Sequence, residues 1–326
     1  MATEPVVLEG SAFARADVFR ALASEARLEI VRLLAERDRS LGELADLVSL
    51  NLATVSRHVQ TLEAAGLVAG RYVPGAQGTQ KLCRLLVHRV SLDLEPVNPE
   101  TGVEESEMPI GLYTLAHVRP GCGMASRTGI LGLADDPQAF LAPGRVEAEL
   151  VWLSEGFLEY TFPNYLPTSV DIWRLDVEAE ICSEAPDFDL DHPSDITVWI
   201  NGVELATWIS PSDFGGRRGR LNPAWWNDHG TQYGMLKTFS ATPEGAMVDG
   251  QRAGSATVAD LLVAPQTPVT VRIGIKPDAR HPGGLNLFGK GFGNYPRDLV
   301  LRLHHRPHRS PSPRNADGVR ALSSPL

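Results

Sequence analysis

The chain has 326 residues, 43% of them hydrophobic, and a formal net charge of −10. This length supports two or three domains with packed cores, and the absence of any run of about 18 apolar residues excludes a membrane-spanning helix. Three scattered cysteines and a first segment unlike a signal peptide predict a cytoplasmic protein without disulfides.

Residues 40–48 are predicted to form a short helix, because Ser40 is a good N-cap and Glu43 completes a capping box. Asn51 is a second N-cap and opens a longer helix that Gly66 ends. Four apolar residues of this helix, spaced i, i+3, i+7 and i+10, predict one buried stripe. They are Leu52, Val55, Val59 and Leu62.

The opposite face of the longer helix is small, polar or basic, as a helix that enters the major groove of DNA requires. The candidate DNA contacts there are Asn51, Thr54, Ser56, Arg57, His58 and Gln60. Two strand-like runs, 67–73 and 79–86, flank a Pro- and Gly-containing turn and predict a β-hairpin. Its candidate phosphate contacts are Arg71, Lys81 and Arg84. Residues 51–90 hold five Lys or Arg against one acid, so the positive charge is local.

Residues 17–86 resemble the ArsR family of winged helix-turn-helix regulators in the motifs ALASEAR, LGELA and TVSRHVQTLEAAGLV. The resemblance implies a homodimer that binds double-stranded DNA at a palindromic operator and represses until an effector releases it. The helix at 13–22 is then expected at the dimer interface. The Cys-x-Cys pair of the metal-sensing members is absent from residues 41–45, so neither a metal site nor a cofactor is expected.

Residues 1–90 are therefore expected to form a DNA-binding domain, and the acidic, Pro-containing segment 91–110 an exposed linker. Residues 304–326 lack hydrophobic periodicity and are expected to be a disordered tail. Its histidines, at 304, 305 and 308, are weak metal candidates.

Residues 111–303 predict a β-sandwich of jelly-roll type, which makes the chain a multidomain α+β protein. The expected strands are 112–118, 147–153, 157–162, 170–181, 196–200, 204–209, 233–240, 269–275 and 298–303. Asn201-Gly202 between two apolar runs is a strong hairpin signal, and 258–263 is expected to form a turn or two of helix. This part of the chain resembles larger regulators that join an ArsR-like domain to a jelly-roll effector domain. The resemblance lies in the segment WINGVELATWISPSDFGGRRGRLNPAWWNDHGTQYGMLKTF.

Four of the six tryptophans lie in residues 199–239, beside Asp, Asn and Arg. Aromatic faces with carboxylates and amides suit a sugar, and the arginines could instead hold a carboxylate or phosphate. The candidate ligand-binding residues are Trp208, Asp213, Arg217, Arg218, Asn222, Trp225, Trp226, Tyr233 and Lys237. Tryptophans in a sandwich are more often part of its core, and that alternative stays open. A second polar run, 276–293 with His281, Asn286, Phe288 and Lys290, could lie on the same rim.

An enzyme is a weaker interpretation. Cys122 near His117 is a weak candidate for a thiolate site or redox switch, and Asp213 with Asp228 for a glycosidase pair. No Walker loop, G-x-S-x-G or H-E-x-x-H motif is present. We expect a non-catalytic, ligand-responsive transcriptional repressor, with a sugar or sugar derivative as one effector class. The alternative is a carbohydrate-binding or carbohydrate-processing protein whose helical part serves dimerisation.

Overall fold

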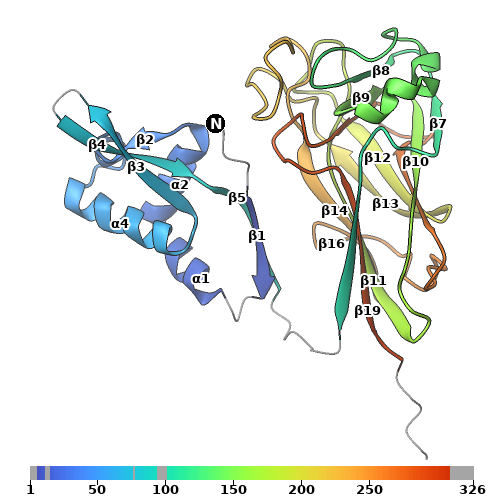
Figure 1. Ribbon diagram of the computed structural model, residues 1–326, viewed down its shortest axis with the longest axis horizontal. Helices are drawn as coiled ribbons and strands as arrows, with labels where there is room; N and C mark the ends of the chain where they lie inside the picture. Colours follow the sequence, from blue (N-terminus) through green and yellow to red (C-terminus); the bar gives the residue numbers. More distant parts are fainter. Residues whose placement is uncertain (1–5, 12–14, 76–77, 94–100, 309–326) are drawn as a thin grey trace, which may run out of the picture.

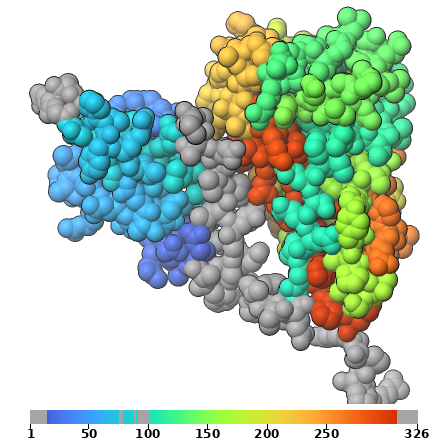
Figure 2. Space-filling model, in the orientation of Figure 1, coloured from blue at the N-terminus to red at the C-terminus, as the bar shows by residue number. Residues whose placement is uncertain are grey.

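The computed structural model describes residues 6–11, 15–75, 78–93 and 101–308. It has a helical N-terminal part, called the head below, and a larger β domain (Figure 1). Figure 2 shows them as two masses, the head in blue and the β domain in green to red. The expected multidomain α+β organisation, with a winged helix followed by an all-β sandwich, is confirmed.

The head packs four helices against a small antiparallel sheet of order β2-β4-β3. The helices are α1 (Ala16–Leu22), α2 (Glu25–Glu36), α3 (Leu41–Leu47) and α4 (Leu52–Ala64). The strands are β2 (Arg39–Ser40), β3 (Val68–Gly75) and β4 (Gly78–Leu85). One apolar cluster, contributed by all four helices, β3 and β4, forms the core of the head.

The predicted helix ends are confirmed. The Ser40 hydroxyl accepts from the backbone N–H of Glu43, and the Glu43 carboxylate accepts from that of Ser40, which completes the capping box. Asn51 caps α4 by accepting from the backbone N–H of Thr54 at 2.9 Å. Gly66 follows α4 with φ +73°, a left-handed conformation that favours glycine.

The buried stripe of α4 has three residues, one fewer than the spacing of its apolar residues predicted. Val55, Val59 and Leu62 are fully buried, whereas Leu52 is 55% exposed. Leu52 is the first residue of α4, next to its exposed cap, and the core of the head begins one turn later.

The expected linker at 91–110 needs correction. β5 (Val87–Asp93) extends into it and pairs in parallel with β1 (Val6–Ser11). β6 (Gly102–Met108) is an edge strand of the β domain, paired with β19 (Leu299–Pro307). The acids of β6 serve as countercharges, because Glu105 accepts from Arg302 and Glu107 from Lys290, each at 2.7 Å. Residues 94–100 lie outside the described residues.

The β domain is a sandwich of two sheets (Figure 1). One has five strands in the order β13-β12-β17-β10-β7. The other has nine: seven follow the order β16-β15-β14-β11-β18-β9-β8, β19 pairs with β11, and β6 pairs with β19. The strands of the first sheet are β7 (Leu115–Val118), β10 (Gly156–Phe162), β12 (Ser194–Ile200), β13 (Val203–Ser210) and β17 (Val269–Ile275). The remaining strands of the second are β8 (Cys122–Ala125), β9 (Leu150–Leu153), β11 (Val170–Cys182), β14 (Met235–Thr242), β15 (Gly245–Val248), β16 (Gln251–Gly254) and β18 (Leu285–Phe288). Short 3-10 helices span Pro137–Leu141 and Pro143–Glu147.

All nine expected strands of this domain are present; 269–275 has the predicted bounds, and the other eight have shifted ends. The sequence missed β6 and the four-residue strands β8, β15, β16 and β18. The expected helical turn at 258–263 is not a helix but a series of turns. The Asn201-Gly202 hairpin is confirmed, with φ +49° and +80° at its two central residues.

From Leu175 onward, strand β11 is buried on both faces. Its odd-numbered apolar residues, from Leu175 to Ile181, belong to the core between the two sheets. Its even-numbered residues carry acids and a thiol on the opposite face, which we call the outer face of the large sheet. That face is closed by residues 211–234, called the covering loop, and by residues 289–298.

The prediction that a disordered tail begins at residue 304 is wrong. β19 continues to Pro307, and His304 bonds the carboxylate of Asp176 at 2.8 Å. His308 lies 2.7 Å from the carboxylate of Asp171. These histidines therefore bond β11 residues, and residues 309–326 lie outside the described part of the chain.

Replacing the cap of α4 tests this account of the head. We expect Asn51→Ala to lower the free energy of unfolding by about 1 kcal/mol, because two donors near the start of α4 lose their acceptor. The far-ultraviolet helical signal during chemical denaturation measures it, since every α-helix of the described residues lies in the head. Asn51→Ser keeps a capping oxygen and serves as control; equal midpoints for the Ala and Ser variants would contradict the role of the cap.

Candidate nucleic-acid interface and ligand pocket

The outward face of α4 is centred on Arg57 and Gln60, both exposed, with half-buried Ser56 beside them. Among the described residues, none of these three side chains has a hydrogen-bond partner. A guanidinium, an amide and a hydroxyl on one exposed helix face can bond base edges and phosphates.

The other candidates on α4 have additional roles. The Thr54 hydroxyl donates to Asn51 at 2.9 Å, so these two side chains form the helix cap. Burial, then the charges of Arg27 and Arg57, lower the pKa of His58 below 6.5, which leaves its ring neutral at pH 7. His58 can therefore offer a hydrogen bond but no charge.

The hairpin of β3 and β4 offers fewer free cations than its sequence suggested. Lys81 donates to Glu63 of α4 at 2.7 Å, and Arg84 forms a two-pronged ion pair with Asp38 at 2.8 and 3.0 Å. Both pairs tie the hairpin to the helices. Arg71 is exposed, and the neighbouring Tyr72 is 75% exposed, an aromatic side chain that the sequence reasoning passed over.

In the β domain the candidate ligand residues separate into groups. Trp208 and Lys237 lie together, with the Lys237 ammonium 4.6 Å from the centre of the Trp208 ring and bonded to Asp249. Lys237 points to the inter-sheet side of β14, because Phe239, two residues on, belongs to the inter-sheet core. The remaining candidates belong to the covering loop, on the other side of the large sheet.

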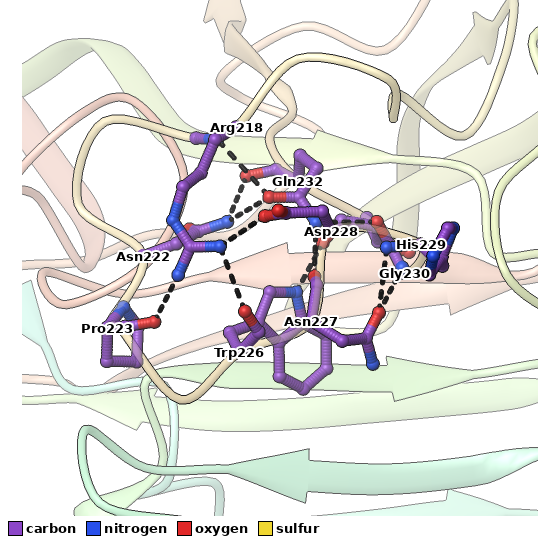
Figure 3. Close-up of polar contacts among 11 residues, drawn as sticks. Arg218, Asn222, Pro223, Trp226, Asn227, Asp228, His229, Gly230 and Gln232 are labelled. Carbon is purple, nitrogen blue, oxygen red and sulfur yellow. Dashed lines mark hydrogen bonds and ion pairs between the residues drawn. The ribbon is translucent and has the colours of Figure 1, made fainter.

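The covering loop is held in shape by its own polar contacts (Figure 3). Arg218 donates to the backbone oxygens of Pro223 and Trp226 and pairs with Asp228. Asn222 donates to Gln232, and its oxygen accepts from the backbone N–H of Gly293 at 2.8 Å. Arg218 and Asn222 therefore support the loop, and Asp228, which is exposed, is a partner of Arg218.

A small pocket lies between the covering loop and the outer face. Its floor follows one cross-strand row of the large sheet, in which Cys182 pairs with Asn286, Asn286 with Trp152, and Trp152 with Gly123. The loop adds Trp226, whose ring centre is 6.3 Å from that of Trp152. We call this space, of about 180 Å³, the tryptophan pocket; its polar lining includes Glu184, Asp187, Asn227, Thr231 and Asn286.

Sequence reasoning found only part of this lining. Trp226 and Asn286 were among the residues singled out, on two different segments that the structure brings together. Trp152 and Glu184 were missed because nothing local shows that their face of the sheet is covered. Trp225 is 38% exposed and bonds the backbone oxygen of Arg127, outside the pocket.

A hydrogen-bonded chain connects the pocket to the buried Asp213. The Asn286 amide donates to Glu184 at 2.7 Å and to Thr231 at 3.3 Å, and the Thr231 hydroxyl donates to Asp213 at 2.8 Å. Burial raises the pKa of Glu184 to about 8 and that of Asp213 to about 7. Glu184 is therefore mostly an uncharged acid at neutral pH, able to donate as well as accept.

Arg217 and Tyr233 lie on another side of the covering loop. The Arg217 guanidinium lies 4.9 Å from the centre of the Tyr233 ring, which stacks on Phe214. Arg217, Arg218 and Arg220 line a cleft of about 490 Å³ whose opposite wall is residues 34–38, Arg84 and Leu85 of the head. Figures 1 and 2 show this gold-coloured part of the β domain on the side nearest the head.

Cys122 does not form a site with His117. It is fully buried in the inter-sheet core, and burial raises its pKa to about 11, which disfavours the thiolate. His117 stacks on Phe157. Within the described residues there is no group of three or more His, Cys, Asp or Glu placed to hold a metal ion, and no helix there is long and apolar enough to cross a membrane.

Comparison with known proteins places the head in a class. Residues 22–71 match the model of a helix-turn-helix domain. The chain is 45% identical over 58 residues to the uncharacterized HTH-type transcriptional regulator Rv0081 of Mycobacterium tuberculosis, covering 18% of this chain and 51% of that protein. It is 36% identical over 78 residues to the HTH-type transcriptional repressor SmtB of the same species, covering 24% and 55%.

A solved structure is similar in sequence over the same region. The homodimeric winged helix-turn-helix DNA-binding domain Mb0332 from Mycobacterium bovis, a possible ArsR-family regulator, is 37% identical, with 22% of this chain and 62% of that one covered and a TM-score of 0.20. The chain spans about half the length of the curated relatives it matches. The head is thus a winged helix-turn-helix domain. It is similar to those of ArsR-type regulators, as the motifs of residues 17–86 predicted.

The buried carboxyl at 213 makes stability depend on pH. Between about pH 4 and 7 the folded chain keeps a proton on Asp213 that the unfolded chain has released, so this contribution to stability falls as pH rises. Asp213→Asn cannot ionise, and its oxygen can still accept from Thr231. We expect the melting temperature of this variant, relative to the unmodified protein, to increase from pH 5 to pH 8. Glu244→Gln, at an exposed site, is the control; a constant difference for Asp213→Asn would refute the assignment.

Proposed function

We propose that this protein is a DNA-binding transcriptional regulator of the ArsR type, a repressor whose β domain binds a small-molecule effector. The observation that carries the proposal is the outward face of α4. Three side chains on that face, those of Ser56, Arg57 and Gln60, have no hydrogen-bond partner among the described residues. The start of α4 is fixed by the Asn51 cap. The hairpin of β3 and β4 follows α4 and adds the exposed Arg71.

The proposed working form is a homodimer on a two-fold operator. Mb0332, whose domain is homodimeric, supports this for the head. Two α4 helices would then enter successive major grooves about 34 Å apart. Lys81 and Arg84 would keep the hairpin in place through Glu63 and Asp38 and add positive potential near the backbone.

The covering loop supports a route from effector to DNA. One part of it forms a wall of the tryptophan pocket, and Arg217, Arg218 and Arg220 line the cleft that faces the head. A ligand that favours one arrangement of this loop would bias the position of the head. The size of the response is limited by the difference in the ligand's affinity for the two arrangements.

The alternative is a carbohydrate-binding protein whose head only dimerises. The tryptophan pocket fits both proposals, so DNA binding separates them. A chain of net charge −10 without a DNA-reading helix would not bind duplex DNA in the presence of competitor. Catalysis forms no part of the proposal: Asp213 is fully buried, and Asp228 is paired with Arg218.

The DNA proposal is tested with Arg57→Ala in a mobility-shift titration on the DNA upstream of the protein's own gene. We expect affinity to fall by about 1–3 kcal/mol if Arg57 bonds a base edge, and the salt slope to drop by about one if it contacts a phosphate. Arg32→Ala is the matched control, because Arg32 is an exposed arginine of α2 paired with Glu29 and Glu36. Unchanged affinity and salt slope for Arg57→Ala would remove α4 as the reading helix.

A further inference from the structure

The tryptophan pocket is an unassigned site of the β domain. It combines two indole rings with carboxyl and amide groups that are already oriented by hydrogen bonds. Its volume of about 180 Å³ is below the roughly 300–1,000 Å³ of pockets for drug-sized ligands. A ligand of one ring fits these dimensions, and a longer one would extend into solvent.

The aromatic floor is held in place by the sheet. Trp152 lies across from Gly123 on β8, and any side chain at position 123 would collide with its indole ring. The ring planes of Trp152 and Trp226 meet at 56°, so the two do not stack face to face. Trp226 is fixed by a bond from its indole N–H to the backbone oxygen of Thr231 at 2.8 Å. Two rings at an open angle offer an apolar face and a side wall to a bound ring.

The polar groups around this floor are suited to hydroxyls. The Asn227 oxygen accepts from the backbone N–H groups of His229 and Gly230, which directs its amide nitrogen, with two donors, elsewhere (Figure 3). Glu184 accepts from Asn286 with one oxygen, and its protonated form has an O–H to donate. Donors and acceptors thus occur together within one small space.

Charge limits the ligand class further. The described residues that line the pocket include Glu184 and Asp187 but no lysine, arginine or histidine. A phosphate or carboxylate would enter without a counterion and next to acidic groups, which is costly in a partly desolvated site. A neutral ligand carries none of this cost and can use the carboxyl and amide groups as hydrogen-bond partners. An amine is the competing class, which the test below separates from it.

From these features we infer that the tryptophan pocket binds a neutral, polyhydroxylated ring of the size of one pyranose, stacked on Trp152 and hydrogen-bonded by Glu184 and Asn227. This inference rests on the proposed function only for its regulatory role, in which the sugar is the effector; the binding site itself stands independently. The arginines of the covering loop take no part in holding the ligand, since Arg218 supports the loop and Arg217 lies on Tyr233.

The test is calorimetric titration of the full-length protein with a panel of neutral probes: glucose, galactose, mannose, xylose, arabinose, rhamnose, fucose and myo-inositol. Glucose 6-phosphate and glucosamine are the charged counterparts. We expect at least one neutral probe to bind, and Trp152→Ala and Glu184→Ala each to weaken it about tenfold or more, equivalent to about 1.4 kcal/mol. Trp152→Phe should restore part of the affinity because it restores an aromatic floor.

Trp208→Ala is the matched control, since Trp208 is a partly buried tryptophan of the same domain on the inter-sheet side. Binding unchanged in Trp152→Ala and Glu184→Ala but lost in Trp208→Ala would overturn the site. Binding of only the phosphate or only the amine, or of no probe, would overturn the ligand class. If Trp152→Ala does not fold, Glu184→Ala decides the outcome.

The same variants in the mobility-shift experiment separate this inference from the proposed function. A protein that binds its operator but none of the probes retains the DNA function and loses the inference. A protein that binds a neutral sugar through Trp152 but no DNA retains the site and loses the proposed function. Release of DNA by the bound sugar, abolished in Glu184→Ala, would establish both.

Discussion

The need to bury the outer face of the large sheet determines most of the β domain. Strand β11 places Glu178, Glu180 and Cys182 on that face, and all three are almost fully buried. A buried carboxyl without partners would cost several kcal/mol, so the segments that cover it must supply donors. Arg297 does so for Glu178, and the backbone N–H groups of residues 234, 294 and 295 do so for Glu180. The covering loop is thereby tied to the sheet, and the tryptophan pocket is the space left where the cover is incomplete.

The local parts of this structure could be predicted from the sequence, because their causes lie within a few residues. The capping box at Ser40, the Asn51 cap and the Asn201-Gly202 hairpin are such cases. Contacts between segments far apart in the sequence could not be predicted in this way. The acids of β6 suggested an exposed linker, but their partners are almost 200 residues away on β19 and beside it. Trp152 was likewise indistinguishable from a core residue, since the cover over it comes from residue 226.

The candidate DNA contacts differ in the same way. Arg57 and Gln60 follow from helical periodicity alone, because the buried face of α4 defines the opposite one. Lys81 and Arg84 were chosen for their charge, yet each is paired with an acid outside the hairpin, Glu63 of α4 or Asp38 between α2 and β2. Such ion pairs, partly shielded from water, hold the hairpin against the rest of the head. The charge of these side chains thus contributes mainly to the geometry of the interface.

Under the proposed function, the covering loop would let a neutral ligand act on a process governed by charge. A ligand without charge cannot change the electrostatic attraction between the head and DNA directly. It can change the position of charged groups, and Arg217, Arg218 and Arg220 belong to the same loop that carries Trp226 and Asn227. Because Arg218 and Asn222 hold that loop together internally, a shift at the pocket would move these arginines with it. Under the proposed function, the loop opposite Arg84 would convert ligand shape into a change in charge geometry beside the head.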